Sequence, residues 1–159
     1  MKGIILAGGL GTRLYPLTTV CNKHLLPIYN KLMIYYPIQA LVDDGITDIM
    51  LVTGGSNAGE FLRLLGNGME FGLKHINYSY QKGEGGIAEA LGMAQYFADK
   101  DKVVVMLGDN VIEKSIKQYV EDFARQPQGA KILIKEVEDP ERFGVPELKG
   151  NKIIEIEEK

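Results

Sequence analysis

Short apolar runs that alternate with helical patterns constrain the fold of this chain more than any other feature. Runs rich in β-branched residues predict buried strands at Gly3–Ala7, Asp48–Thr53, Ile76–Tyr80 and Val103–Leu107. Apolar residues spaced three and four apart predict helices at about Met33–Asp43, Ala58–Gly66, Ile87–Phe97 and Ser115–Arg125. This alternation is typical of an α/β fold with a doubly wound, mostly parallel sheet and helices on both faces.

The pattern changes after Gly129. The stretches "KILIKEV", "FGVPEL" and "KIIEIEE" alternate in steps of two, which predicts a small and more exposed C-terminal β extension. Internal repeats, low-complexity tracts and linkers are missing from the sequence. We therefore expect residues 1–159 to form a single Rossmann-like α/β domain with this extension.

Composition fits an ordinary globular protein. The chain has 159 residues, 45% hydrophobic and 25% charged, and folding at this size buries roughly 70% of the surface of the unfolded chain. Its single cysteine excludes a disulfide scaffold. The sequence has no apolar run long enough to span a bilayer and no signal-peptide region, so we expect a cytoplasmic protein without a membrane partner.

The charges are unevenly distributed along the chain. The net charge of −3 argues against a nucleic-acid partner, because binding to a phosphate backbone depends on accumulated Lys and Arg. Met1 to Ala40 contains no Asp or Glu, however, and carries Lys2, Arg13, Lys23 and Lys31. This basic opening favours one local anionic ligand over a chance distribution of surface charge.

The first strand pattern ends in a glycine-rich loop, "AGGLGTRLYP". A dinucleotide fingerprint would need glycine where Leu14 stands, and an acid about 20 residues later, where the chain has only basic and neutral residues. A P-loop that starts at Gly8 would need Gly-Lys-Ser/Thr where the chain has Arg13-Leu14-Tyr15. Neither common phosphate-binding motif is therefore present, because the residues that each requires do not stand at the required positions.

What remains in this loop is a set of free backbone N–H groups followed by a guanidinium. The glycines let a ligand approach the backbone, and the donors of Arg13 suit phosphate oxygens. Lys23, ten residues later, could add a second cation where pyrophosphate would leave. The structural alternatives are that the loop is a tight turn with a surface arginine, and that Lys23 is only a solvated charge. We expect His24 to be packed or hydrogen-bonded locally, because no metal-ligand partner stands at ligand spacing.

Two later loops follow predicted strands. In "YSYQKGEGGIAEAL", the amide of Gln81 could read the edge of a base, and Gly86 would let the backbone come close; a plain glycine turn is the alternative. In "VVVMLGDN", Asp109 follows the most hydrophobic strand, at the edge where doubly wound sheets bind ligands. A carboxylate there, together with substrate phosphates, fits Mg²⁺.

With these motifs collected, the chain resembles the glucose-1-phosphate thymidylyltransferases, a family of sugar-nucleotide pyrophosphorylases. The resemblance covers almost the whole chain and rests on "LAGGLGTRLYPLT", "NKHLLPIYNKLMIYYPI", "YQKGEGGIAEAL", "LGDN", "DPERFGVPEL" and "IEEK". It implies that a sugar 1-phosphate attacks the α-phosphate of a nucleoside triphosphate, dTTP being the favoured one, and releases pyrophosphate. The resemblance also implies that relatives continue past "EEK" with the rest of the sugar pocket and a second metal-binding aspartate.

The same resemblance assigns roles to residues. Catalysis would depend on Arg13, Lys23 and Asp109, with Asp109 as the Mg²⁺ ligand. The sugar phosphate would be bound by Gly144, Glu158 and Lys159. The nucleotide would be bound by Leu6, Gly8, Gly9, Gly11, Thr12, Arg13, Gln81 and Gly86.

Two alternatives stay open from the sequence. The chain could be a nucleotide-binding module that binds the triphosphate and turns over poorly, because the family continues beyond its last residue. A nicotinamide-binding oxidoreductase fits the fold but not Leu14 or the missing acid. We also expect a homo-oligomer, because the apolar strand Lys152–Ile156 could pair with another copy.

Overall fold

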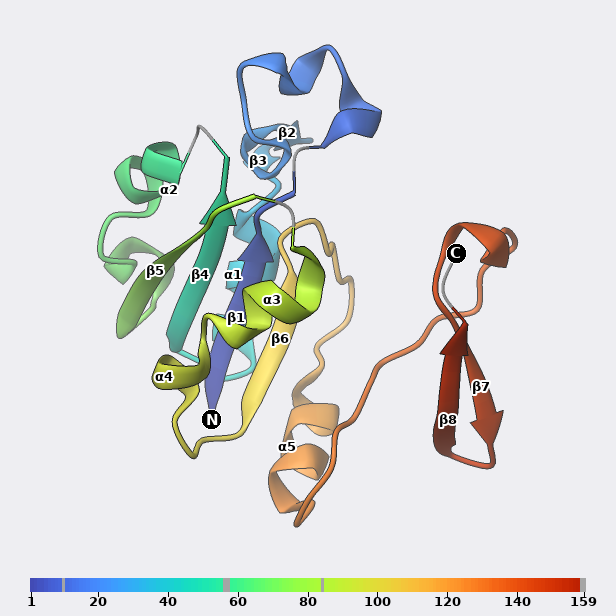
Figure 1. The fold of residues 1–159 in the computed structure, drawn as a ribbon. Helices are drawn as coiled ribbons and strands as arrows, with labels where there is room; N and C mark the ends of the chain where they lie inside the picture. The colour runs from blue at the N-terminus through green and yellow to red at the C-terminus, as the bar shows by residue number, and fades with distance from the viewer. Residues whose placement is uncertain (10, 56–57, 84, 158–159) are drawn as a thin grey trace. The chain divides into compact units, whose positions relative to one another are not determined.

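The structure is a computed structural model that describes residues 1–9, 11–55, 58–83 and 85–157 (Figure 1). The chain divides into two compact units, Met1–Pro127 and Gln128–Lys159. The sequence gives no boundary at this position. The first unit contains the sheet and the helices that pack on it, and the second contains a hairpin.

A four-stranded parallel sheet forms the centre of the first unit. Its strands are β1 (Lys2–Ala7), β4 (Asp48–Gly54), β5 (His75–Gln81) and β6 (Val103–Leu107), in the order β5-β4-β1-β6. All four strands were predicted, with ends that differ by at most one residue. Because every strand runs the same way, the glycine loop and the segments after the other three strands all begin at the carboxyl edge of the sheet (Figure 1).

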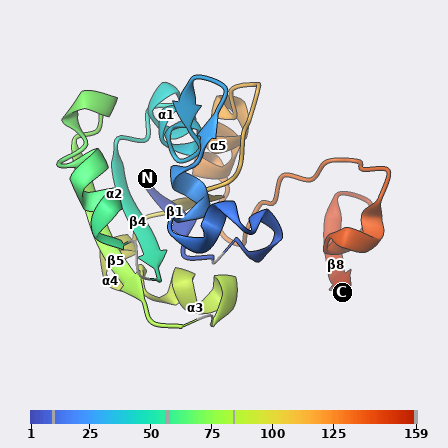
Figure 2. The same cartoon turned by 90° about the horizontal axis from the view of Figure 1, so that it is seen from above.

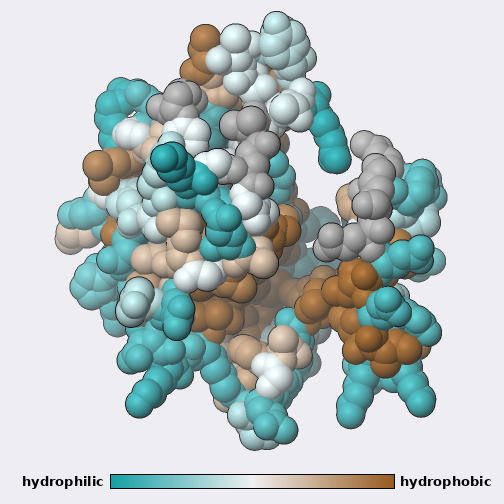
Figure 3. All heavy atoms as spheres, in the orientation of Figure 1, coloured by the Kyte–Doolittle hydropathy of each residue, from teal (hydrophilic) through white to brown (hydrophobic). Residues whose placement is uncertain are grey.

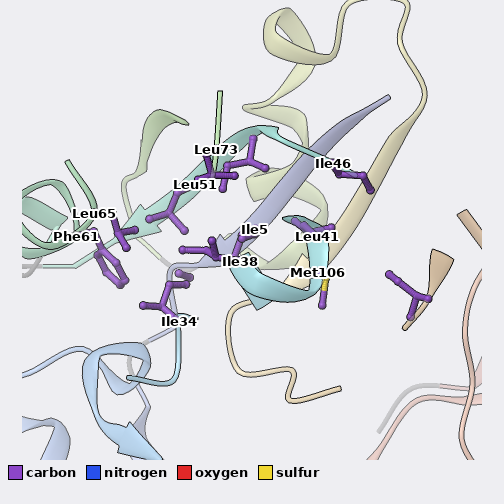
Figure 4. Packing of buried hydrophobic residues seen from close by; sticks show 13 residues of the cluster. Ile5, Ile34, Ile38, Leu41, Ile46, Leu51, Phe61, Leu65, Leu73 and Met106 are labelled. Atoms are coloured by element: carbon purple, nitrogen blue, oxygen red, sulfur yellow. The ribbon is translucent and has the colours of Figure 1, made fainter. Parts of the chain in front are cut away.

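Alternating residues of the central strand face two separate apolar clusters. Ile5 and Ala7 belong to the larger cluster, together with residues of the helices α1 (Tyr35–Asp43) and α2 (Ala58–Leu65) and with Ile116, directly before α5 (Lys117–Arg125) (Figure 4). Ile4 and Leu6 belong to the smaller cluster, with Ala90 of α3 and Ala94. A buried central strand therefore has a continuous apolar sequence, "IILA", because both of its faces are covered.

The helices lie on both faces of the sheet, as predicted (Figure 2). One face is covered by α1 (Tyr35–Asp43), α2 (Ala58–Leu65) and α5 (Lys117–Arg125), and the other by α3 (Gly86–Gly92) and α4 (Gln95–Ala98). The single helix expected at Ile87–Phe97 is wrong, because the chain leaves helical geometry at Ala94, where ψ is 3°. Gly92, which disfavours helix, precedes this break.

Two side chains, one directly after α1 and one directly before β6, form hydrogen bonds at the ends of α5. The carboxylate of Asp44 accepts hydrogen bonds from Ser115 Oγ at 2.5 Å and from the Ile116 N–H at 2.9 Å, just before the helix begins. The Lys102 ammonium donates to the carbonyls of Phe123 and Ala124 at 3.0 and 2.8 Å, near its end. These contacts satisfy groups that a helix leaves unpaired at its ends.

The segment between β1 and α1 is built from short elements. The segment begins with three 3₁₀ turns, η1 (Thr12–Leu14), η2 (Leu17–Thr19) and η3 (Lys23–Leu25). A hairpin follows whose strands, β2 (Pro27–Ile28) and β3 (Lys31–Leu32), have two residues each. The sequence does not predict this hairpin, because two residues per strand show no periodicity. Further 3₁₀ turns are η4 (Met69–Phe71) and η5 (Pro140–Arg142).

The second unit contains β7 (Val145–Lys149) and β8 (Lys152–Glu157), paired antiparallel with a register shift at Glu147/Leu148. These strands confirm the small β extension. The strand expected in "KILIKEV" is wrong, because residues 131–137, all described, form no strand. Alternation yields a strand only where a second strand offers hydrogen bonds. Ile154 and Ile156 of this unit are exposed. Figure 3 shows apolar side chains at the surface of the molecule.

Candidate functional site

A hollow of about 240 Å³ at the carboxyl edge of the sheet brings most predicted nucleotide-site residues together. A larger hollow, of about 380 Å³, is lined by Lys2, Asp48 and His75, which open strands β1, β4 and β5 at the opposite edge. We place the candidate site in the smaller hollow, because only that one is lined by the predicted residues. Those among its lining are Leu6, Gly8, Gly9, Lys23, Gln81, Gly86 and Asp109.

Lys23 and Asp109 form an ion pair inside this hollow. Lys23 Nζ donates to Asp109 Oδ2 at 2.6 Å, joining η3 to the loop after β6. Burial pushes the pKa of Asp109 up, but the hydrogen bond and charge of Lys23 outweigh it and bring that pKa below its ordinary value. Asp109 is therefore an anion at neutral pH, next to a cation that can instead meet a phosphate.

His24 is packed beneath the pair, as the sequence predicts. Its Nδ1–H donates to Asn22 Oδ1 at 2.7 Å, and Asn22 Nδ2 donates to the carbonyl of Ala7 at 3.3 Å. A side chain at Gly108 would lie 2.7 Å from His24 Cδ2, so the ring lies directly against that glycine. Burial, and then the charge of Lys23, lower the pKa of His24 to about 4. A neutral imidazole therefore connects the end of β1 to the end of β6.

The glycine loop contacts the ion pair through the stem of Lys23. Gly11 has φ of 67°, a conformation that disfavours other residues, and a Cβ there would lie 2.9 Å from Lys23 Cβ. A Cβ at Gly9 would lie 3.9 Å from Lys23 Nζ. Thr12 and Arg13, in η1, are exposed and are not among the described residues that line the hollow. Their roles stay predictions.

The Gln81 side chain lies on the other side of the hollow. It is buried at the end of β5, and its Nε2 donates to the Gly86 carbonyl at 3.3 Å and to Glu89 Oε1 at 3.2 Å. Its Oε1 would lie 3.0 Å from a Cβ at Gly8. The amide is thus held by α3 and lies against the glycine loop, next to space a base could occupy.

The donor set of this hollow fits Mg²⁺ bound together with a substrate. In the described part of the chain, no three His, Cys, Asp or Glu side chains are grouped as a metal site. Asp109 would thus contribute one carboxylate, and Mg²⁺ commonly takes its other ligands from phosphates and water.

No helix among the described residues is long and apolar enough to cross a membrane.

The predicted sugar-phosphate residues lie in the second unit. Gly144 comes directly before β7, and a Cβ there would lie 3.3 Å from Ile156 Cγ2. Glu158 and Lys159 lie outside the described residues. The predicted roles of all three therefore stay predictions.

Several contributors to this site were missed by the sequence analysis. Asn22, which joins His24 to β1, carries no signal beyond being a good cap residue before a turn. Glu89 could have been noticed three residues after Gly86, on the first turn of a predicted helix. The missed residues that line the hollow, besides the buried histidine, are Gly83, Ile87, Ala90 and Leu107.

Comparison with known proteins agrees with the fold and the motifs. A glucose-1-phosphate thymidylyltransferase of Neisseria meningitidis is 45% identical over the whole chain, which covers 56% of that protein. One from an Actinoplanes species is 40% identical over the whole chain, which covers 52% of it. The chain thus spans about half the length of these curated relatives.

A solved structure and a family match complete the comparison. A crystal structure from Bacillus anthracis, of a protein proposed to be a glucose-1-phosphate thymidylyltransferase and complexed with sucrose, superposes with a TM-score of 0.95 at 52% identity. It covers 99% of this chain, which covers 64% of that one. Residues 2–159 match the family described as nucleotidyl transferase. The chain therefore belongs to the nucleotidyl transferase family.

Proposed function

We propose that this chain supplies the nucleotide-binding part of a glucose-1-phosphate thymidylyltransferase, with dTTP as the favoured nucleotide. The observation that carries the proposal is the convergence of the glycine loop, the Lys23–Asp109 pair and the Gln81 amide around one hollow. Loop amides and a lysine suit a triphosphate, and the amide suits a base. The named relatives support the choice of nucleotide and sugar.

The proposed reaction needs positioning and charge neutralisation. A phosphate oxygen of glucose 1-phosphate forms a bond to the α-phosphorus of dTTP, and the bond from that phosphorus to the bridging oxygen breaks. Pyrophosphate leaves with the electron pair. The attacking oxygen is already an anion, so no general base is required; alignment and the cations lower the barrier.

Each residue would act through its charge or its backbone. Gly8 and Gly9 would bring N–H groups to the phosphates, and Lys23 and Arg13 would balance the negative charge of the leaving pyrophosphate. Asp109 would hold Mg²⁺, which supplies further neutralisation when bound. Lys23 can turn to phosphate as its partner Asp109 binds the metal, because both side chains are only partly buried.

The sugar phosphate would be bound by Gly144, Glu158 and Lys159. A further part of the proposal is self-association, supported by the exposed Ile154 and Ile156 on β8. A cytoplasmic location completes it and rests on the sequence alone. The alternative is a module that binds the triphosphate without efficient transfer.

Three measurements on one sample test these functions. We expect calorimetry to show binding of dTTP with Mg²⁺ to the chain, with glucose 1-phosphate binding weakly. Pyrophosphate release should be orders of magnitude slower than in a relative of full length, because transfer requires both substrates in line. Absence of dTTP binding would contradict both functions, and robust turnover would exclude the module.

A further inference from the structure

The amide of Gln81 is held in one orientation by two acceptors. Its nitrogen donates to the Gly86 carbonyl at 3.3 Å and to Glu89 Oε1 at 3.2 Å. An amide nitrogen has two hydrogens, and both are used in these contacts. Turning the amide over would place its oxygen against a carbonyl and a carboxylate, so the nitrogen must face α3.

Glu89 reaches this amide by passing over a glycine. A Cβ at Gly85 would lie 1.6 Å from Glu89 Oε2 and 2.1 Å from its carboxyl carbon. The carboxylate thus occupies the space that any side chain at position 85 would need. Gly85 has φ of −73°, which alanine also adopts, so the backbone would accept a side chain at this position. The obstacle to a side chain there is the Glu89 carboxylate.

The remaining oxygen of the amide determines what the hollow offers to a base. With the nitrogen used, Gln81 presents Oε1 alone, on the side of Gly8. An oxygen there accepts from the imide N3–H that thymine and uracil share. Cytosine has a lone pair at N3, which would face the lone pairs of Oε1 without a hydrogen between them.

We propose that Glu89 is a positioning residue that fixes the Gln81 amide, and thereby makes the site select bases with an N–H donor over cytosine. The proposal rests on the proposed nucleotide-binding function of this hollow. Without the carboxylate, one amide hydrogen loses its partner and the amide can turn. A turned amide offers an N–H to cytosine N3, so discrimination between the bases falls.

Titration of the intact chain with dTTP, UTP and dCTP, each with Mg²⁺, tests this role. Glu89→Ala should lower the ratio of dTTP to dCTP affinity by roughly tenfold, as expected for one charge-assisted hydrogen bond. The ratio of dTTP to UTP should stay within twofold, because both bases carry the imide. Glu89→Gln should keep the selectivity, since its own amide oxygen can accept from Gln81.

Gly85→Ala provides an independent variant that leaves Glu89 in the chain. Its methyl group displaces the carboxylate, so its selectivity should fall as in Glu89→Ala. Because the displaced atoms end a flexible side chain, folding should be preserved, and this variant decides the matter if Glu89→Ala is unstable. Glu121→Ala, an exposed glutamate on α5, is the matched control and should behave as the unmodified chain.

The outcomes separate this proposal from the one on which it rests. If the unmodified chain binds no dTTP, the proposed function is wrong and this inference fails with it. If it prefers dTTP to dCTP, and both Glu89→Ala and Gly85→Ala keep that preference, only the role of Glu89 is overturned. Equal weakening of all three nucleotides would also contradict it, because a purely structural residue would have that effect.

Discussion

The two units of the chain use their apolar residues in opposite ways. In Met1–Pro127, Phe61 and Ile38 are almost fully buried between the helices and the sheet, whereas in Gln128–Lys159 Ile132 and Ile154 are each more than half exposed. A lone hairpin is marginally stable in water, while a sheet covered on both faces buries a complete core. The first unit therefore holds the candidate site against a buried core, whereas the second leaves large apolar side chains exposed.

The two proposed substrates would therefore be bound by parts of the chain that differ in how well their apolar residues are buried. The residues proposed for the nucleotide come from the ends of buried strands and from the turns next to them. Those proposed for the sugar phosphate begin at Gly144, beside the hairpin. Nucleotide binding should therefore be measurable in this chain independently of sugar-phosphate binding.

The largest expected effect contrasts one apolar residue from each unit. Phe61→Ala should lower the free energy of unfolding by about 3–5 kcal/mol, because it leaves a cavity in a closed core. Ile154→Ala should change it by less than about 0.5 kcal/mol, because that side chain is exposed. Urea unfolding measures both; similar values for the two variants would remove the distinction between the units.

Protonation of His24 should weaken the first unit in acid. The folded pKa is about 4 and the ordinary value is 6.5, so between these values the unfolded chain takes up the proton and the folded chain does not. Stability should therefore fall as pH drops from about 6.5 to about 4, by about 2–3 kcal/mol from this group.

Unfolding curves of matched histidine variants across that range isolate this contribution. His24→Gln should flatten the pH dependence. His75→Gln, which replaces the other of the two histidines, an exposed one, is the matched control. Parallel pH profiles for His24→Gln and the unmodified chain would show that His24 does not titrate in this window.

A smaller effect separates the two ends of the sheet. Asp109→Asn should reduce dTTP affinity in the presence of Mg²⁺ by at least about tenfold, because the metal loses its carboxylate. Asp101→Asn is the control: Asp101 also pairs with a lysine, Lys2 at 3.0 Å, but beyond the amino end of β1. It should bind dTTP as the unmodified chain does. Equal affinities for the two variants would contradict a metal role for Asp109.

The smallest effect concerns the exposed loop arginine. Arg13→Ala should weaken dTTP binding about fivefold, since an exposed cation contributes roughly 1 kcal/mol to an ion pair. Its melting temperature should stay unchanged, because the side chain is exposed. Arg63→Ala, on the surface of α2, should alter neither quantity. A large stability loss with normal binding would make Arg13 structural.

The sequence predicts the core strands well because buried strands carry a dense local signal. β6 lies where it was predicted, and β1, β4 and β5 each differ by a residue or two in total length. The break at Ala94 and the irregular course of residues 131–137 depend on packing and on the presence of a partner strand. Neither the packing nor the partner strand can be predicted from the local sequence pattern.

Part of the site follows from topology alone. Gln81 ends one parallel strand and Asp109 follows another, so the strand topology alone places both residues at the same edge of the sheet. The pairing of Lys23 with Asp109, and the burial of His24 under Gly108, depend on the path of the chain across that edge. Local sequence patterns do not predict that path, so these two contacts could not be predicted from the sequence.

The most direct test that the nucleotide binds at the carboxyl edge of the sheet is to map the backbone N–H signals of the intact chain by NMR during titration with dTTP and Mg²⁺. The shifted signals should cluster at Gly8, Gly9, Gln81, Gly86 and Asp109, and the N–H signals of β7 and β8 should not move. Shifts centred on Lys74 and His75, at the opposite edge of the sheet, or on the hairpin would contradict it.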